Sequence, residues 1–169
     1  YDVASITKMI STLPNIIKQY DEGKVTLDTR IGEMLPQTIG TNKDTIKLKT
    51  LLSHYARLQA WIPFYKATLD SLKMPSKKYY SQNYSTDFSK KVSENLYIRN
   101  DYHDTIMKII YDSKLIDKLE YRYSDFTFIL LKEYLEQNTG KTLDVLSQEN
   151  FYNSMGMNNT MYNPLQRVE

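Results

Sequence analysis

The 169-residue sequence contains no cysteine, which excludes a disulfide framework and any thiolate metal site. It also lacks a charge excess, because 22 Lys and Arg against 20 Asp and Glu leave a net charge of +2. That balance, with no basic block, gives no reason to expect nucleic acid or an anionic membrane surface as a partner. No apolar run approaches the roughly 20 residues of a membrane-spanning helix, so we expect no membrane span.

The chain further lacks internal repeats, an initiator methionine and a charged-then-apolar leader. What it has is an ordinary globular composition, with 41% hydrophobic and 25% charged residues. A chain of this length can bury a sizeable core. We therefore expect residues 1–169 to form a single α-rich domain.

A Ser-x-x-Lys sequence stands near the amino terminus, from Ser5 to Lys8. On a helix, side chains three residues apart stand one above the other, so Ser5 Oγ and Lys8 Nζ can meet. The pair is a candidate nucleophile and base. Apolar residues recur through this region at steps of three and four, which predicts one buried helical face. They are Ile6, Met9, Ile10, Leu13, Ile16, Ile17 and Tyr20.

The same tetrapeptide has an ordinary explanation. Serine and lysine are common, and about one Ser-x-x-Lys is expected by chance in a chain of this length. A serine that caps a helix, followed by a solvated lysine, accounts for it equally well. Only the second half of the chain favours the catalytic interpretation.

Helical periodicity returns in that second half. We expect helices over about residues 101–113, 124–140 and 142–156, the middle one capped by Ser124 or Asp125 and stopped by a glycine. Upstream, Asp28 is expected to cap a brief helix, and residues 92–98 to contribute a hairpin. The sequence therefore predicts a mainly α fold with few strands.

Four segments come in the order and at the separations seen in one known family. They are Ser5–Lys8, Leu51–His54, Tyr123–Asp125 with the following Phe128–Leu131, and Phe151–Thr160. In them the chain resembles class C β-lactamases, DD-peptidases and related serine esterases, the penicillin-binding type of serine hydrolase. The resemblance covers nearly the whole chain and implies the helical part of a β-lactamase-like fold.

The resemblance also implies roles for individual residues, and no cofactor. Ser5 would be the acylated nucleophile and Lys8, if partly neutral, the base that accepts its proton. Tyr123 would relay or accept that proton, its phenolate stabilised by the lysine. Asp125 stands at the substrate-binding position where the family usually has Asn. A carboxylate there favours the charged form of Lys8, which opposes its role as a base.

Two further departures concern the loop after His54 and a missing strand. Tyr55-Ala56-Arg57 replaces the family's Thr-Ser-Gly, so this loop should take a different path. The family's Lys/His-Thr/Ser-Gly strand, which supplies one oxyanion N–H, is absent, and one such donor is worth about 10²–10³ in rate. We therefore expect an excised fragment without its terminal sheet strands, inactive in isolation and prone to self-association through the bare sheet-facing surface.

A narrower resemblance rests on Ala60–Lys66 and on Asn163-Pro164-Leu165. These segments are similar to β-lactamase-like domains fused behind a family 3 glycoside hydrolase, of the β-N-acetylglucosaminidase type, in Bacteroidetes-type bacteria. Two hypotheses follow. The first is acyl transfer to Ser5, then hydrolysis of a cell-wall peptide, ester or β-lactam; the second is a non-catalytic interaction or substrate-positioning domain beside the glycosidase. The resemblance alone implies the periplasm or cell envelope.

The remaining candidates have weaker support. His54 and His103 are far apart and lack ligand spacing, so we expect no metal site. His54 is expected to be a structural histidine at a helix end. Trp61 is expected to anchor the core, with stacking on a sugar as the alternative.

Overall fold

The computed structural model describes residues 1–164, so Leu165, which contributed to the narrower resemblance, lies outside the described residues. The chain divides into two compact units. One is formed by Tyr1–Ala60 with the chain from Ile116 onward, and the other by Trp61–Leu115. The candidate catalytic residues all belong to the first unit.

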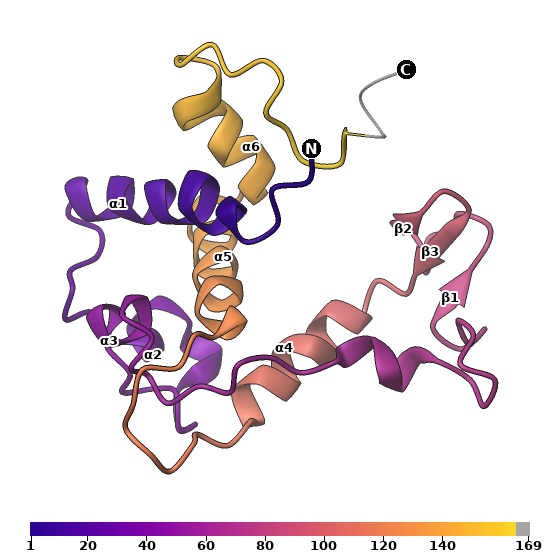
Figure 1. The fold of residues 1–169 in the computed structure, drawn as a ribbon, viewed down its shortest axis with the longest axis horizontal. Coiled ribbons are helices and arrows are strands. Elements are labelled where there is room, and N and C mark those ends of the chain that lie inside the picture. Colours follow the sequence, from indigo (N-terminus) through magenta and orange to yellow (C-terminus); the bar gives the residue numbers. More distant parts are fainter. Residues whose placement is uncertain (165–169) are drawn as a thin grey trace. The chain divides into compact units, whose positions relative to one another are not determined.

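The first unit is built around α5 (Asp125–Thr139). The π-helical turn η1 (Lys8–Thr12) continues into α1 (Leu13–Asp21), and α6 (Leu143–Ser147) continues into a second π-helical turn, η4 (Gln148–Tyr152). The turn η1 packs against both α5 and α6, and α1 packs against α5 (Figure 1). This packing holds the start of the first helix against α5.

The helix α5 forms where the periodicity predicted it. The Ser124 side chain accepts a hydrogen bond from the Phe126 N–H at its start, and Gly140, with φ of 68°, ends it in the left-handed conformation. Its apolar side chains supply the centre of the unit's core. Those almost fully buried are Phe126, Leu130, Leu131 and Leu135.

The prediction that the apolar side chains of the first helix form its buried face is wrong. Ile6, Met9, Ile17 and Tyr20 are about half exposed, and Ile16 alone of the seven apolar residues is fully buried. The side that packs on α5 and α6 is instead polar. Its buried residues include Ser11, Thr12, Asn15 and Gln19. Periodicity identifies an apolar stripe, but it does not say which side of the helix meets the neighbouring elements.

A buried hydrogen-bond network satisfies these polar side chains. Ser11 Oγ lies 2.5 Å from Ser147 Oγ and accepts a 2.7 Å bond from the Tyr162 hydroxyl. The Asn15 amide donates to Ser147 Oγ, and its oxygen accepts from Asn150 at 2.7 Å. Because buried polar groups cost free energy unless they are paired, this network fixes how η1 sits against α6.

Three short elements complete the first unit: α2 (Ile31–Met34), η2 (Pro36–Thr38) and α3 (Leu48–Leu52). The prediction that Asp28 caps a helix is wrong, because Arg30 occupies the N-cap position of α2. Asp28 instead forms ion pairs with Lys47 and Lys49 at 2.9 and 2.8 Å. These two lysines hold the pKa of the Asp28 carboxyl well below its usual value, at about 2.

The second unit contains η3 (Phe64–Thr68), a three-stranded sheet and α4 (Tyr102–Asp112). The strands are β1 (Tyr80–Ser81), β2 (Lys90–Ser93) and β3 (Leu96–Ile98). They pair antiparallel in the order β1-β3-β2, with a register shift in the β2–β3 hairpin. The predicted hairpin and the predicted helix over residues 101–113 are therefore confirmed.

The expectation that Trp61 anchors the core is wrong, because its side chain is 60% exposed. The described chain is helix-rich with one small sheet, so the mainly α class describes it only loosely. Within residues 1–164, no helix combines the length and apolar character needed to cross a bilayer.

Candidate active site

Ser5 lies in the turn that leads into η1. The N–H groups of Thr7 and Lys8 donate to the carbonyls of Ala4 and Ser5, both at 3.1 Å, and begin the helix. Ala4 has φ of 44°, a left-handed conformation that a residue with a side chain seldom adopts. Such strained backbone tends to occur at functional sites. The Ser5 side chain is exposed and open to a substrate.

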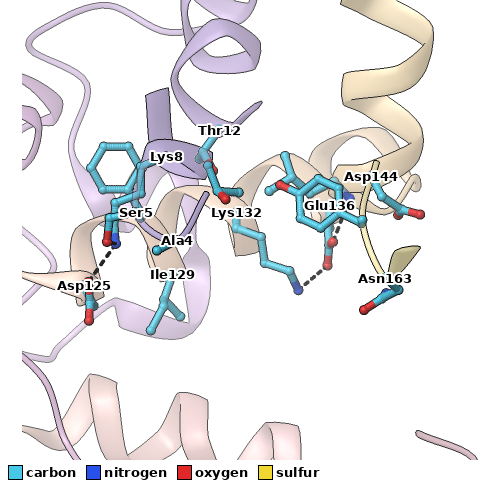
Figure 2. Close-up of a pocket in the computed structure, with 14 residues that line it drawn as sticks. Ala4, Ser5, Lys8, Thr12, Asp125, Ile129, Lys132, Glu136, Asp144 and Asn163 are labelled. Carbon is cyan, nitrogen blue, oxygen red and sulfur yellow. Dashed lines mark hydrogen bonds and ion pairs between the residues drawn. The ribbon is translucent and has the colours of Figure 1, made fainter. Parts of the chain in front are cut away.

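Lys8 joins Ser5 to α5. Its Nζ donates to Ser5 Oγ at 3.0 Å and forms an ion pair with Asp125 Oδ1 at 2.8 Å (Figure 2). The same nitrogen lies 5.2 Å from the centre of the Tyr123 ring. Burial lowers the pKa of Lys8, but hydrogen bonds to Asp125 and Tyr123 outweigh that effect and raise it above its ordinary value. Lys8 is therefore held as a cation.

The pKa of the Tyr123 phenol is shifted in the opposite direction to that of Lys8. Hydrogen bonds to Lys8 and then to Ser5 lower the pKa of its hydroxyl, and these contacts outweigh the effect of burial. The hydroxyl of Ser5, the amine of Lys8 and the phenol of Tyr123 thus come together from two distant parts of the sequence. A hydroxyl beside a phenol of lowered pKa, with an ammonium next to both, is equipped for general-base-assisted acyl transfer.

His54 lies against this group, although the sequence offered it only a structural role. Its ring centre is 4.8 Å from that of Tyr123, and its Nδ1 accepts a hydrogen bond from the Ser124 N–H at 3.3 Å. The one sequence signal for this arrangement was the Leu51–His54 segment of the family resemblance. That signal carried no role for the imidazole.

Ser5, the candidate nucleophile, lines a cleft of about 560 Å³ within the first unit. Ser5 and Lys8 form one end, and Asp125, Ile129, Lys132 and Glu136 line the cleft along one face of α5 (Figure 2). Lys132 forms an ion pair with Glu136 (Figure 2). The cleft is large enough for a peptide-sized acyl group. Among the described residues, no three His, Cys, Asp or Glu side chains gather as metal ligands.

Relatives of this chain carry names of hydrolases. The N-acetylmuramyl-L-alanine amidase of Bacillus subtilis (strain 168) is 29% identical over 175 residues, which cover 99% of this chain and 34% of that protein. An Escherichia coli (strain K12) protein provisionally named a D-alanyl-D-alanine carboxypeptidase is 30% identical over 165 residues, covering 98% of this chain and 34% of that protein. The chain thus spans about a third of the length of these curated relatives.

The fold has solved counterparts. A D-stereospecific amidohydrolase from Streptomyces sp. superposes with a TM-score of 0.61 at 17% sequence identity, over 90% of this chain and 41% of that one. The sequence model of the β-lactamase family matches residues 1–169. The resemblance inferred from the four sequence segments is therefore confirmed, and this chain belongs to the β-lactamase family.

Proposed function

We propose that this chain supplies the nucleophile and base of a serine hydrolase of the β-lactamase and penicillin-binding type. One observation carries the proposal: Lys8 Nζ lies 3.0 Å from Ser5 Oγ and 5.2 Å from the centre of the Tyr123 ring. A structural serine cap would explain none of these contacts. Asp125, across the ion pair from Lys8, would orient the lysine and meet the substrate.

The opposite pKa shifts favour Tyr123 over Lys8 as the base. Ser5 Oγ attacks the carbonyl carbon of the substrate, and its proton passes to the Tyr123 oxygen as the new bond forms. The leaving group departs with that proton, which leaves an acyl-serine. Water then attacks the acyl carbon, gives its proton to Tyr123, and Ser5 departs with it. Tyr123 accepts each proton as the phenolate and stays a neutral phenol until it gives that proton away. The Lys8 ammonium, 5.2 Å from the ring centre, stabilises the phenolate form.

The substrate class follows from the names of the two curated relatives, which point to cell-wall peptides. An ester or a β-lactam presents the same acyl carbon and would enter the same cleft. The cell envelope or periplasm is the corresponding location. Since the chain spans about a third of its relatives' length, we also propose that it is the helical part of a larger hydrolase domain.

The exposed apolar stripe of the first helix fits that larger domain. Ile6, Met9, Ile17 and Tyr20 are each about half exposed, on the side away from α5 and α6. Further strands of the domain would cover this stripe. Without them, a second copy of the chain would be the alternative partner.

Covalent labelling tests the proposal. The longest natural polypeptide that contains this chain is incubated with a fluorescent penicillin and, separately, with a fluorophosphonate. We expect mass spectrometry to locate an adduct on Ser5, none in the Ser5→Ala variant, and an unchanged adduct in Ser53→Ala. That control alters an exposed serine whose hydroxyl donates to the Thr50 carbonyl. Absence of an adduct with both probes, in folded protein, would reject the proposed serine-hydrolase function.

A second function is favoured by the Lys8–Asp125 ion pair, because it keeps Lys8 charged and so leaves Tyr123 without a neutral lysine to assist it as a base. The chain would then be a non-catalytic interaction or substrate-positioning domain, with a fused β-N-acetylglucosaminidase-type glycoside hydrolase as its neighbour. It would bind a cell-wall fragment in the same cleft without reacting. Failure of both labelling probes, together with binding of an intact fragment, is its signature.

Replacing Asp125 with asparagine should shift acylation to lower pH. The carboxylate raises the pKa of Lys8 by a hydrogen bond and by its charge, and its charge also raises that of Tyr123. Removing the carboxylate lowers both pKa values. The acylation rate increases with pH as the base loses its proton, so in the variant this increase should occur at lower pH, whichever group is the base.

The measurement is the labelling rate between about pH 5 and pH 10, a range that spans the ordinary pKa values of histidine and tyrosine. The Asp28→Asn variant serves as control, because that carboxylate pairs with Lys47 and Lys49. An unchanged profile, or a shift to higher pH, would show that Asp125 does not control the base.

A further inference from the structure

The backbone on both sides of Tyr123 is held by one residue, His54. The His54 carbonyl accepts a 2.9 Å hydrogen bond from the Arg122 N–H, and its Nδ1 accepts a 3.3 Å bond from the Ser124 N–H. Tyr123 therefore sits between two anchored neighbours. The first anchor uses only backbone atoms, so any residue at position 54 can supply it; the second requires the imidazole.

The imidazole also packs against the ring that it positions. The His54 and Tyr123 rings are inclined at 44° with centres 4.8 Å apart, and Tyr121 and Phe128 lie beside the imidazole at 6.0 and 6.1 Å. These contacts limit rotation of the Tyr123 ring. The Tyr123 ring is thereby held beside Lys8, whose Nζ lies 5.2 Å from the ring centre.

The backbone of His54 is itself in an uncommon conformation, with φ of 59°. This left-handed geometry turns the chain at the end of α3, so that carbonyl and ring both face the Arg122–Ser124 segment. Because Nδ1 accepts a hydrogen bond, the neutral ring carries its proton on Nε2. If Nδ1 were also protonated, it would become a donor facing the Ser124 N–H donor, and the hydrogen bond between them would be lost.

The groups around His54 favour its neutral form. Burial is the first cause that lowers the pKa of the imidazole, and the Lys8 charge lowers it further, while Asp125 has a smaller opposing effect. The titratable groups that face it are Lys8 from η1, Asp125 from α5, and the Tyr121 and Tyr123 phenols from the segment before α5. Histidine is the side chain whose ordinary pKa places its charge change nearest to neutral pH.

We propose that His54 is a positioning residue for Tyr123: its neutral imidazole fixes the phenol for proton transfer from Ser5, and protonation at Nδ1 releases the Ser124 N–H and misplaces the phenol. This inference rests on the proposed function, to which it adds a residue and an acid switch. A misplaced base costs much of its rate, because proton transfer depends on a hydrogen-bonded geometry.

Two substitutions at position 54 distinguish the positioning role of the Nδ1 acceptor from the packing contribution of the imidazole ring. In His54→Asn, Oδ1 occupies the place of Nδ1, accepts the Ser124 N–H without titrating, and tolerates positive φ. In His54→Ala both the acceptor and the ring are lost. In the longest natural polypeptide, we expect acylation of Ser5 by a fluorophosphonate to fall by about tenfold or more in His54→Ala. His54→Asn should recover most of that loss.

The pH profile gives the readout that a merely structural histidine would not move. In the wild type, the acid limb of the acylation profile should steepen by one additional proton below the His54 pKa, which burial lowers from its ordinary value. In His54→Asn that additional step should be absent. Equal loss of rate in both variants, or an acid limb of the same steepness in His54→Asn and wild type, would overturn the proposal.

Nuclear magnetic resonance decides the matter without any acylation, so failure of the proposed function remains distinguishable. We expect a long-range ¹⁵N–¹H spectrum of the same polypeptide to show Nδ1 of His54 unprotonated at neutral pH. Tyr123 ring signals should move as His54 titrates, and not in His54→Asn. A protonated Nδ1 at neutral pH, or Tyr123 signals that ignore the titration, would refute the positioning role.

Discussion

Replacing Tyr123 with phenylalanine should slow acylation of Ser5 by about 10²–10⁴-fold, the usual contribution of a positioned general base. The substitution removes one oxygen and keeps the ring that packs against His54. The Lys8 ammonium cannot replace the lost base, since its hydrogen bond to Asp125 keeps its pKa raised. Stopped-flow labelling with a fluorescent penicillin, using the longest natural polypeptide, measures the effect.

Tyr121→Phe is the matched control. It removes the same atom two residues away, from an exposed ring that meets the edge of the His54 imidazole. We expect its acylation rate to stay close to that of the wild type. If Tyr123→Phe were equally mild, the phenol would not be the base, and Lys8 would have to accept the serine proton after losing its own.

Replacing Phe126 with alanine should lower the free energy of unfolding by about 3–5 kcal/mol, the usual cost of removing a buried phenylalanine ring. Phe126 is 0% exposed and lies in the first turn of α5, beside the Ser124 cap. Natural domains have only about 5–15 kcal/mol of net stability, so this loss would be a large fraction of the total. Urea denaturation of the chain, followed by far-ultraviolet circular dichroism, measures it.

Leu119→Ala provides the comparison, because Leu119 is 70% exposed and its truncation should change stability by no more than about 0.5 kcal/mol. A Phe126→Ala midpoint that coincides with that of Leu119→Ala would mean that the start of α5 is not packed as described. The position of Asp125, the residue directly before Phe126, would then be in question as well.

The elements predicted well are those whose signals are local. α5 combines a serine cap, a run of apolar residues and a terminal glycine, and each of these acts within one or two helical turns. The pairing of Ser5 with Lys8 is local in the same sense, since residues three apart face one another wherever such a turn forms. Both could be inferred without knowing the rest of the fold.

The first helix was predicted with the wrong side buried because burial is a property of two surfaces. Its apolar stripe is real, yet α5 and α6 meet the opposite side, where Ser11 and Asn15 find hydrogen-bond partners. Those partners lie more than 130 residues away. No periodicity within residues 5–20 could have identified them.

The sequence by itself determined the family, the capped helix α5, the hairpin with α4, and the candidates Ser5, Lys8, Tyr123 and Asp125, because motifs and periodicities are written into short stretches of chain. Tertiary structure alone decided that Asp125 reaches Lys8, that opposite pKa shifts separate the lysine from the phenol, and that the His54 ring lies against Tyr123. Hydrogen bonds and charge interactions act over a few ångströms in space. Groups about 70 residues or more apart in sequence acquire these properties only once the chain has folded.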